Sequence, residues 1–274
     1  MSLTNKIDFA IIIGVKNANP NGDPLNGNRP RINYDGHGEI SDVCIKRKIR
    51  NRLLDMGENI LVQSDDYRTD EYRSIKARYD ANKSIMIDKK NKDGEQKAKI
   101  ASKEWFDVRA FGQVLAGVDD TNASIAIRGP VSIQSAFSVE PVDVSSMQIT
   151  KSVNLTTNAK DPSQKSGDTM GMKHRVERGV YVTFGSINRQ LAEKTGFSDE
   201  DAQTLKEAIL KLFENDESSA RPAGSMEVLK VIWWTHTDKV LSSAKVHKSL
   251  SVNADGSYTI EQLEGVMADE LDAL

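Results

Sequence analysis

The chain has 274 residues; Lys and Arg number 37, Asp and Glu number 40, and the net charge is −3. Hydrophobic residues (38%) and charged residues (28%) occur in the proportions of a globular protein that buries a core. The single cysteine, Cys44, excludes an internal disulfide and a multi-thiolate metal site. No apolar stretch approaches the roughly 18 residues of a membrane-spanning helix, and we expect no secretory signal. These features predict a cytoplasmic protein of one large or two small domains.

Charge is distributed unevenly along the chain. Residues 28–52 contain seven cations and three anions, whereas residues 255–274 contain six anions and no cation. A local basic segment favours contact with a polyanion even when the net charge is slightly negative. The alternative is that both segments are ordinary solvated surfaces.

The first elements are predicted to be a strand, a turn-rich loop and a helix. Residues 7–15 form a β-branched apolar run typical of a buried strand. Residues 17–31 are so rich in Pro, Gly and Asn that they predict successive turns. Ser41 is a predicted helix N-cap, and apolar residues then recur at helical spacing as far as Met56.

The helix after Ser41 carries five cations beside its apolar stripe, namely Lys46, Arg47, Lys48, Arg50 and Arg52. Within the same segment only Asp42 and Asp55 are available to neutralise them. Such a surplus repels itself, so it predicts an anionic ligand. The alternative is a solvated helix whose long cationic side chains extend into water.

Two long polar segments interrupt the predicted core. Residues 57–103 are expected to be an irregular insertion, with a mobile lysine-rich part at 83–99, and residues 105–115 to form a short helix. Residues 141–172 are expected to be a second excursion from the sheet.

Strands are predicted at 124–137, broken at Gly129-Pro130, at 176–187 and at 227–235. A capping box at Ser198 begins a second long helix, and residues 246–260 favour a hairpin. The order strand, helix, strand, strand, helix, strand predicts an α+β fold. Its core is expected to be a ferredoxin-like or RNA-recognition-motif-like antiparallel sheet with helical, finger-like and thumb-loop insertions.

Motifs for catalysis or metal binding are weak. The loop at 17–31 superficially resembles a calcium loop but lacks the formal charge that a hard cation needs. No phosphate-binding glycine motif or nucleophile elbow occurs, and the four histidines lack metal-ligand spacing. His174, between Lys173 and Arg175, is a candidate for base stacking or acid–base chemistry, or is simply an exposed basic residue. We therefore expect no catalytic residue, cofactor or metal.

Several motifs together resemble the Cas-seven family, the backbone subunit of type I-C CRISPR Cascade. The resemblance spans roughly residues 6–252 and is carried by the segments Asn17 to Arg31, Ser41 to Arg50, Trp105 to Gly112, Arg128 to Val131, Lys173 to Gly179, Thr195 to Ser198 and Ala244 to Lys248.

This resemblance implies a non-catalytic protein that polymerises along a CRISPR RNA as a helical filament and presents the guide for pairing with target DNA in antiviral defence. Its implied partners are further copies of itself, a Cas-five-type subunit, large and small Cascade subunits, and a recruited nuclease-helicase. No membrane partner is expected. The implied regions are a palm (1–56, 124–140 and 176–260), a finger-like insertion with a helix (57–123), a thumb (141–175) and an acidic C-terminal tail (261–274).

The resemblance assigns phosphate contacts first to Lys46, Arg47 and Arg50. Further RNA-binding candidates follow in order: Asn19, Asn21, Arg29 and Arg31, then Arg109, Lys173, His174 and Arg175. Met170 and Met172 are candidates for a wedge between bases or for contacts with a neighbouring subunit. Contacts with phosphate suit a guide holder because they are independent of sequence.

Two other functions compete with this assignment. Related backbone subunits of type III effectors cut target RNA with a loop aspartate and a metal, and Asp23 is the corresponding candidate here, although a structural turn explains it more simply. The third alternative is a generic α/β interaction module without nucleic acid.

Overall fold

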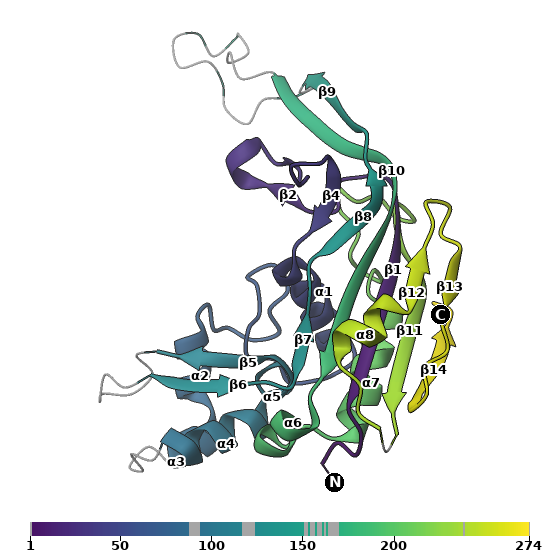
Figure 1. The fold of residues 1–274 in the computed structure, drawn as a ribbon. Coiled ribbons are helices and arrows are strands. Elements are labelled where there is room, and N and C mark those ends of the chain that lie inside the picture. The colour runs from purple at the N-terminus through teal and green to yellow at the C-terminus, as the bar shows by residue number, and fades with distance from the viewer. Residues whose placement is uncertain are drawn as a thin grey trace.

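A computed structural model describes residues 2–87, 94–116, 124–150, 170–237 and 239–273, together with positions 153, 157, 161 and 163. Figure 1 shows a long curved sheet with a separate lobe of short strands and helices beside one end. No described helix is long and apolar enough to cross a membrane.

Among the described elements, strands contact one another more than helices do. They are β1 (Ile7–Ala18), β2 (Gly22–Asp23), β3 (Arg29–Pro30), β4 (His37–Ile40), β5 (Gly112–Leu115), β6 (Ile125–Arg128), β7 (Val131–Ile133), β8 (Ala136–Pro141), β9 (Val144–Thr150), β10 (Met170–Ile187), β11 (Met226–His236), β12 (Leu250–Val252), β13 (Tyr258–Ile260) and β14 (Val266–Leu271).

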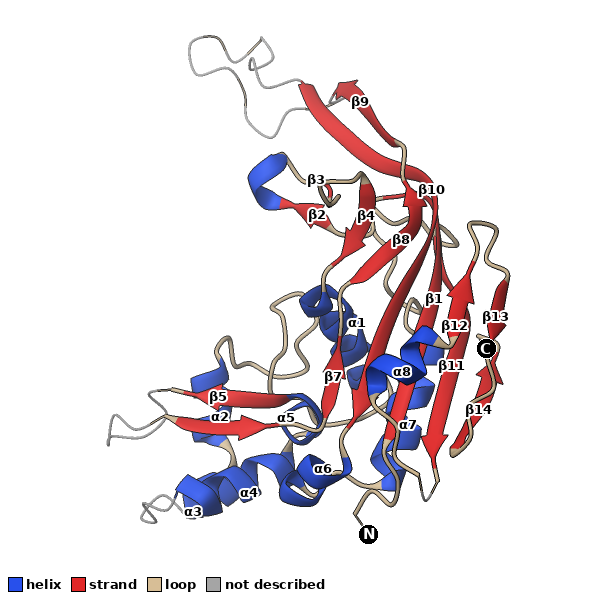
Figure 2. Ribbon diagram, in the orientation of Figure 1, coloured by secondary structure: helices blue, strands red, loops and turns tan. Residues whose placement is uncertain are grey.

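The helices are mostly short, as Figure 2 shows by colour. They are η1, a single 3₁₀ turn (Pro24–Asn26), α1 (Asp42–Asp55), α2 (Ile75–Ala81), α3 (Lys83–Ile87), α4 (Gly94–Glu104), α5 (Phe106–Phe111), α6 (Arg189–Thr195), α7 (Asp199–Leu210) and α8 (Ser243–Lys248).

The main sheet has eight antiparallel strands, and its principal order is β14-β11-β1-β10-β8-β4. The short strands β7 and β9 also pair with β10. Along the chain, β1, α1, β7–β8, β10, α7 and β11 give the predicted order of strand, helix, strand, strand, helix, strand. The predicted antiparallel α+β core is confirmed.

The apolar residues of β1 supply both faces of this sheet because strand side chains alternate. Phe9, Ile11 and Ile13 belong to the larger core, which α1 and α7 cover. Ala10 belongs to a smaller core on the opposite face, where it packs with Trp234 of β11 and Val246 of α8.

The lobe beside the sheet, formed by α2 to α5 with β5 and β6, has a core of its own. Tyr79, Trp105 and Leu61 are buried there with residues from α3, α4 and β6. The expectation that residues 57–103 are irregular was therefore wrong. Apolar residues that are sparse in each segment converge from several segments, which local periodicity does not reveal. Part of the 83–99 segment, residues 88–93, lies outside the described residues.

The helix predicted at 105–115 ends early, at Phe111, and residues 112–115 form β5. Gly112 causes this change of direction. Its φ is 75°, and a Cβ there would lie 2.3 Å from the carbonyl oxygen of Ile127. Only glycine permits both the positive φ and the close approach to β6.

The C-terminal region differs from the sequence expectation in two places. Residues 246–248 belong to α8, and the predicted hairpin is confined to β12 and β13. The acidic segment 261–274 is not a separate tail, because its β14 pairs with β11 from Val231↔Leu271 to His236↔Val266. The apolar residues of β14 that face the cores are few, which concealed a strand among the acids.

A buried ion cluster fastens the N-terminal strand to the C-terminal half. The carboxylate of Asp8 is fully buried and lies 2.7 Å from Nε2 of His236 and 3.0 Å from Nζ of Lys6. Nδ1 of His236 accepts the backbone N–H of Leu241 (3.2 Å), so the proton of this neutral ring resides on Nε2 and is donated to Asp8.

Burial of Asp8 by itself raises the pKa of this carboxyl group. Hydrogen bonds from His247, Ser243, His236 and Lys6 outweigh burial and hold the pKa well below its usual range. The ionised form of Asp8 therefore stabilises the folded state.

We expect Asp8→Asn to lower the free energy of unfolding by about 3 kcal/mol at pH 7, since it leaves Lys6 without its buried partner. The pKa of Asp8 is lowered by folding. Its stabilisation is therefore complete above the unfolded value of about 3.9 and declines as the pH falls below it. Urea denaturation should show the gap between wild type and variant narrowing from pH 7 to pH 3.

The exposed Asp65→Asn is the matched control and should leave the unfolding free energy unchanged across the same range. A gap for Asp8→Asn that stays constant with pH would contradict the assigned role of the ionised carboxylate.

Candidate nucleic-acid interface

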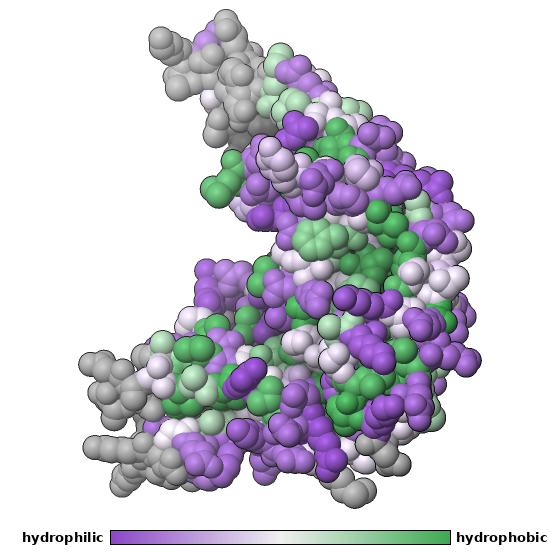
Figure 3. Space-filling view, viewed as in Figure 1, coloured by the Kyte–Doolittle hydropathy of each residue, from purple (hydrophilic) through white to green (hydrophobic). Residues whose placement is uncertain are grey.

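Helix α1 begins at Ser41, whose Oγ accepts the N–H of Cys44 (3.4 Å), as the sequence predicted. Ile45, Ile49 and Leu53 are buried in the larger core. The burial of these three residues sets the orientation of α1, and therefore the directions in which its five cations point. Figure 3 shows that the molecular surface is hollowed between the end that bears β9 and the lobe that contains β5 and β6.

Most cations of α1 have carboxylate partners from other parts of the chain. Arg50 Nε lies 2.9 Å from the carboxylate of Asp107, Arg52 lies 2.8 Å from Glu214, and Lys48 pairs with Asp216. The expectation that only Asp42 and Asp55 face these cations was wrong. The neutralising acids come from α5 and from the segment after α7, so no spacing within 41–56 identifies them.

Asp107 accepts hydrogen bonds from three different residues. Besides Arg50, its carboxylate accepts the N–H groups of Leu61 (2.8 Å) and Val62 (3.1 Å), and its side chain is 1% exposed. The Arg50–Asp107 pair therefore joins α1, the connection after it and α5.

Lys46 and Arg47 are the α1 cations whose charge remains most available. Lys46 pairs with Asp42 (3.0 Å) on a partly exposed surface. Such a pair contributes little to stability, so Lys46 can exchange Asp42 for another anion at little cost. Arg47 donates to the neutral carbonyl oxygen of Val62 (3.0 Å). Burial and the neighbouring charge of Arg50 lower the pKa of Arg47, but an arginine remains protonated at neutral pH.

The asparagines of the turn-rich loop stabilise the backbone. Asn19 is buried and donates to the carbonyl oxygen of Asn28 (2.7 Å), while Oδ1 of Asn21 accepts both the N–H (2.9 Å) and the Oγ–H (2.8 Å) of Ser41. The loop is thus attached to the N-terminus of α1. Both asparagines thus have a structural role, although Oδ1 of Asn19 is buried without a hydrogen-bond partner among the described residues.

Asp23 also has a structural role in this loop. It accepts the N–H of Leu25 (3.2 Å), which caps η1, and lies 3.6 Å from Arg31. Among the described residues no group of three or more His, Cys, Asp or Glu side chains is placed to hold a metal ion. The contacts of Asp23 with Leu25 and Arg31 give this residue a structural role in the loop.

Strand β3, which contains Arg29, packs against β10. Asn21 joins this strand region to α1, because its carbonyl oxygen accepts the N–H of Arg31 (2.9 Å) and its Oδ1 accepts the N–H of Ser41 (2.9 Å). Within the part of the chain that the structure describes, Arg29 forms no ion pair within 4 Å.

The β9–β10 hairpin presents the basic run predicted at 173–175. His174 contacts Oγ of Ser146 (2.8 Å) and Arg175 donates to Oγ of Ser145 (3.3 Å). Neither Lys173 nor Arg175 forms an ion pair within 4 Å among the described residues, so both charges are unneutralised. The hairpin extends to Met170, beyond the predicted start of the strand at residue 176.

Apolar side chains are unusually exposed on the same hairpin. Met170 is 62% and Met172 55% exposed, and they share a face of β10 because side chains alternate. On the other face, Ile149 of β9 is 47% exposed. The face of Ile149 is also that of Lys173 and Arg175, whereas the face of the two methionines carries His174.

Arg109 lies apart from these residues. It binds Asp201 at the N-terminus of α7 (2.7 Å), approaches Glu58 (3.9 Å) and stacks over the ring of Phe106 (4.7 Å). This arrangement joins α5 to α7 and explains Arg109 as a structural residue.

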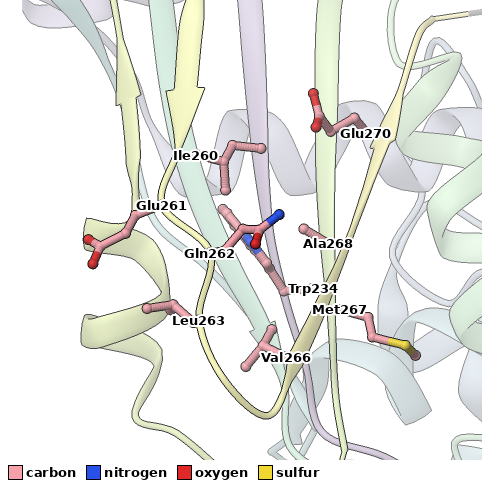
Figure 4. A pocket seen from close by; sticks show the side chains of 9 residues that line it. All are labelled: Trp234, Ile260, Glu261, Gln262, Leu263, Val266, Met267, Ala268 and Glu270. Atoms are coloured by element: carbon pink, nitrogen blue, oxygen red, sulfur yellow. The ribbon is translucent and has the colours of Figure 1, made fainter.

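A cavity of about 420 Å³ lies on the other face of the sheet, between β11, β14 and the connection after β13 (Figure 4). Its floor is apolar, with Trp234 and Val266, and its charged lining consists of Glu261 and Glu270 without any cation among the described residues. A polyanion is repelled by such a lining. The side of the sheet that carries α1 is thus the better candidate.

The fold defines an antiparallel α+β protein with an inserted lobe and a projecting hairpin. The family model described as CRISPR-associated protein Cas7 matches residues 5–268, and the chain belongs to this family. The CRISPR-associated protein Cas7 of Haloferax volcanii is 25% identical over 238 residues, which cover 82% of this chain and 68% of that protein.

Solved structures show a similar fold. A chain of a CRISPR RNA-guided surveillance complex, pre-nicking, has 16% sequence identity and a TM-score of 0.54, over 92% of this chain and 84% of that one. A chain of another CRISPR RNA-guided surveillance complex has 17% identity and a TM-score of 0.49, over 92% and 77% of the two chains.

We expect Arg50→Ala to destabilise the protein by about 3 kcal/mol, because it leaves the buried carboxylate of Asp107 without its charged partner. Lys46→Ala removes a partly exposed pair and should cost below about 1 kcal/mol. Urea denaturation of the two variants checks this difference. Equal losses of stability would contradict the division between structural and available cations.

Proposed function

We propose that this protein is a CRISPR RNA-binding backbone subunit of a type I-C Cascade, which polymerises along the guide and presents it for pairing with target DNA. The observation that carries this proposal is a set of cations on α1, β3 and β10 whose charge remains available. Arg29, Arg47, Lys173 and Arg175 have no carboxylate partner among the described residues, and Lys46 has only the partly exposed Asp42. Phosphate contacts hold any guide sequence, and base pairing then supplies specificity.

Within this set we assign phosphate contacts to Lys46, Arg47, Arg29, Lys173 and Arg175. Arg50 and Arg109 have buried or bidentate carboxylate partners, and Asn19 and Asn21 hold the loop, which favours supporting roles for these four. Arg31 is paired with Asp23, which favours a secondary role, and we propose that His174, on the face of β10 that Met170 and Met172 share, contacts a base or a phosphate.

We further propose that the regions have the roles implied by the family: a palm (1–56, 124–140 and 176–260), fingers (57–123) and a thumb (141–175). Other Cascade subunits and a nuclease-helicase would then bind to the assembled filament. Such a subunit has no catalytic residue of its own, and the cap that Asp23 provides to η1 favours this over a metal-dependent endonuclease.

The protein purified with its CRISPR RNA should have a high ratio of absorbance at 260 nm to that at 280 nm and should sediment as large particles. Lys46→Glu combined with Lys173→Glu should lower both, since two phosphate contacts become repulsive. The exposed pair Lys245→Glu and Lys248→Glu is the control with the same change in charge and should retain both properties.

A protein that remains monomeric and free of nucleic acid in the presence of added CRISPR RNA at low salt would contradict the proposal. Cleavage of complementary RNA in the presence of Mg²⁺, abolished by Asp23→Ala, would instead establish the endonuclease.

Met170 and Met172 are proposed to separate bases of the guide. A guide that carries 2-aminopurine at successive positions should show bright, unstacked positions at regular intervals in the wild-type complex. Met170→Ala with Met172→Ala should dim these positions while the salt dependence of binding stays the same, because apolar wedges act on stacking and cations act on phosphates. Unchanged fluorescence in this variant would contradict the wedge.

A further inference from the structure

A second basic groove lies on the lobe, between α4, β6 and α6. Two adjoining cavities of about 400 and 590 Å³ share Lys99, Ser102 and Thr195 in their walls. Figure 2 shows α4 and α6 on the side of the lobe that faces away from β9 and α1. The groove is therefore separate from the proposed guide surface.

Cations dominate the charged lining of this groove. They are Lys99, Lys103, Arg109, Arg128 and Lys194, whereas Glu95 and Glu193 are the carboxylates in the lining.

Ion pairs within the chain account for part of this charge. Arg109 binds Asp201, and Lys99 lies 2.9 Å from Glu95. Glu193 lies 3.5 Å from Arg189, which does not line the groove, so its charge is not reserved for the lysines.

Three cations of the groove remain available. Lys103, Arg128 and Lys194 are exposed, and none forms an ion pair within 4 Å with a described residue. They come from three different elements, α4, β6 and α6, that pack against one another. Their mutual repulsion is relieved when an anion occupies the groove between them.

The remaining walls suit a polymer of phosphates. Ala98, Ser102, Thr195 and Gly196 are small, so an extended backbone can approach the cations closely. Lys103 lines one of the two adjoining cavities, Arg128 lines the other, and Lys194 lines both. Cations spread over two cavities in this way fit successive phosphates better than a single anion, and such contacts are independent of base sequence.

We propose that the α4–α6 groove binds the phosphodiester backbone of a nucleic-acid strand other than the guide. This inference rests on the proposed function only in assigning the guide to the opposite surface. The chemistry of the groove itself does not depend on that assignment.

The test uses the complex purified with its guide. Binding of fluorescein-labelled single-stranded oligo(dT) and of an unrelated DNA duplex is measured by anisotropy over a range of salt concentrations. Lys103→Ala, Arg128→Ala and Lys194→Ala are combined in one variant. The control combines Lys16→Ala, Lys245→Ala and Lys248→Ala, three exposed cations outside the groove that remove the same charge.

The groove variant should bind at least one probe about tenfold more weakly than the control variant at low salt, and its slope of log affinity against log salt should fall by about two. The probe whose binding weakens identifies the ligand as single-stranded or duplex nucleic acid. Guide content, read from the absorbance ratio, should equal that of the control.

Equal affinity of the groove and control variants for both probes would overturn the inference. If the groove variant loses guide in parallel with probe binding, the groove belongs to the guide surface. If it forms smaller particles with unchanged probe binding, the groove belongs to a protein interface. Either result also overturns the inference. If the wild type carries no guide, the proposed function fails, and the groove is still tested on the guide-free protein with the same probes.

Discussion

The buried carboxylate of Asp107 is the interaction on which the arrangement of sheet and lobe depends. It accepts hydrogen bonds from Arg50 on α1 and from two consecutive backbone N–H groups just after that helix. Asp107 itself stands in the first turn of α5, where a negative charge is favourable. One side chain thus joins the helix that covers the main sheet to the separate core of the lobe.

This constraint also divides the basic residues of the chain into two kinds. Cations that meet carboxylates from distant segments, such as Arg50 and Arg109, hold elements together. Those that meet neutral oxygens or water, such as Arg47 and Lys173, keep a positive potential at the surface. A polyanion can then bind or leave without removing the ion pairs that maintain the fold.

The sequence predicted the main strands, the caps at Ser41 and Ser198, and the α+β order, because these depend on short-range periodicity and local hydrogen bonding. It did not predict the core of the lobe, since Leu61, Tyr79 and Trp105 are far apart in the chain and each lies in a polar context.

The sequence predicted the cationic residues of the candidate site but not the carboxylates that neutralise some of them. The acids that neutralise Arg50 and Lys48 lie about 60 and 170 residues away, respectively, so spacing carries no signal for them. The α4–α6 groove was missed for the same reason, because Lys103, Arg128 and Lys194 come from three separate segments. Of the residues that line it, only Arg109 was given an RNA-binding role by the resemblance, although the segments that begin at Arg128 and Thr195 also carry that resemblance.

One edge of the main sheet is formed by β14, a short strand that carries the exposed Asp269 and Glu270 towards its C-terminal end. An unprotected edge is a template for uncontrolled pairing between molecules, and charge along it discourages such pairing. The charges on β14 thereby protect the molecule from aggregating through this edge of its sheet at high concentration. A specific contact between molecules then has to be made by side chains on other surfaces rather than by the backbone of this edge.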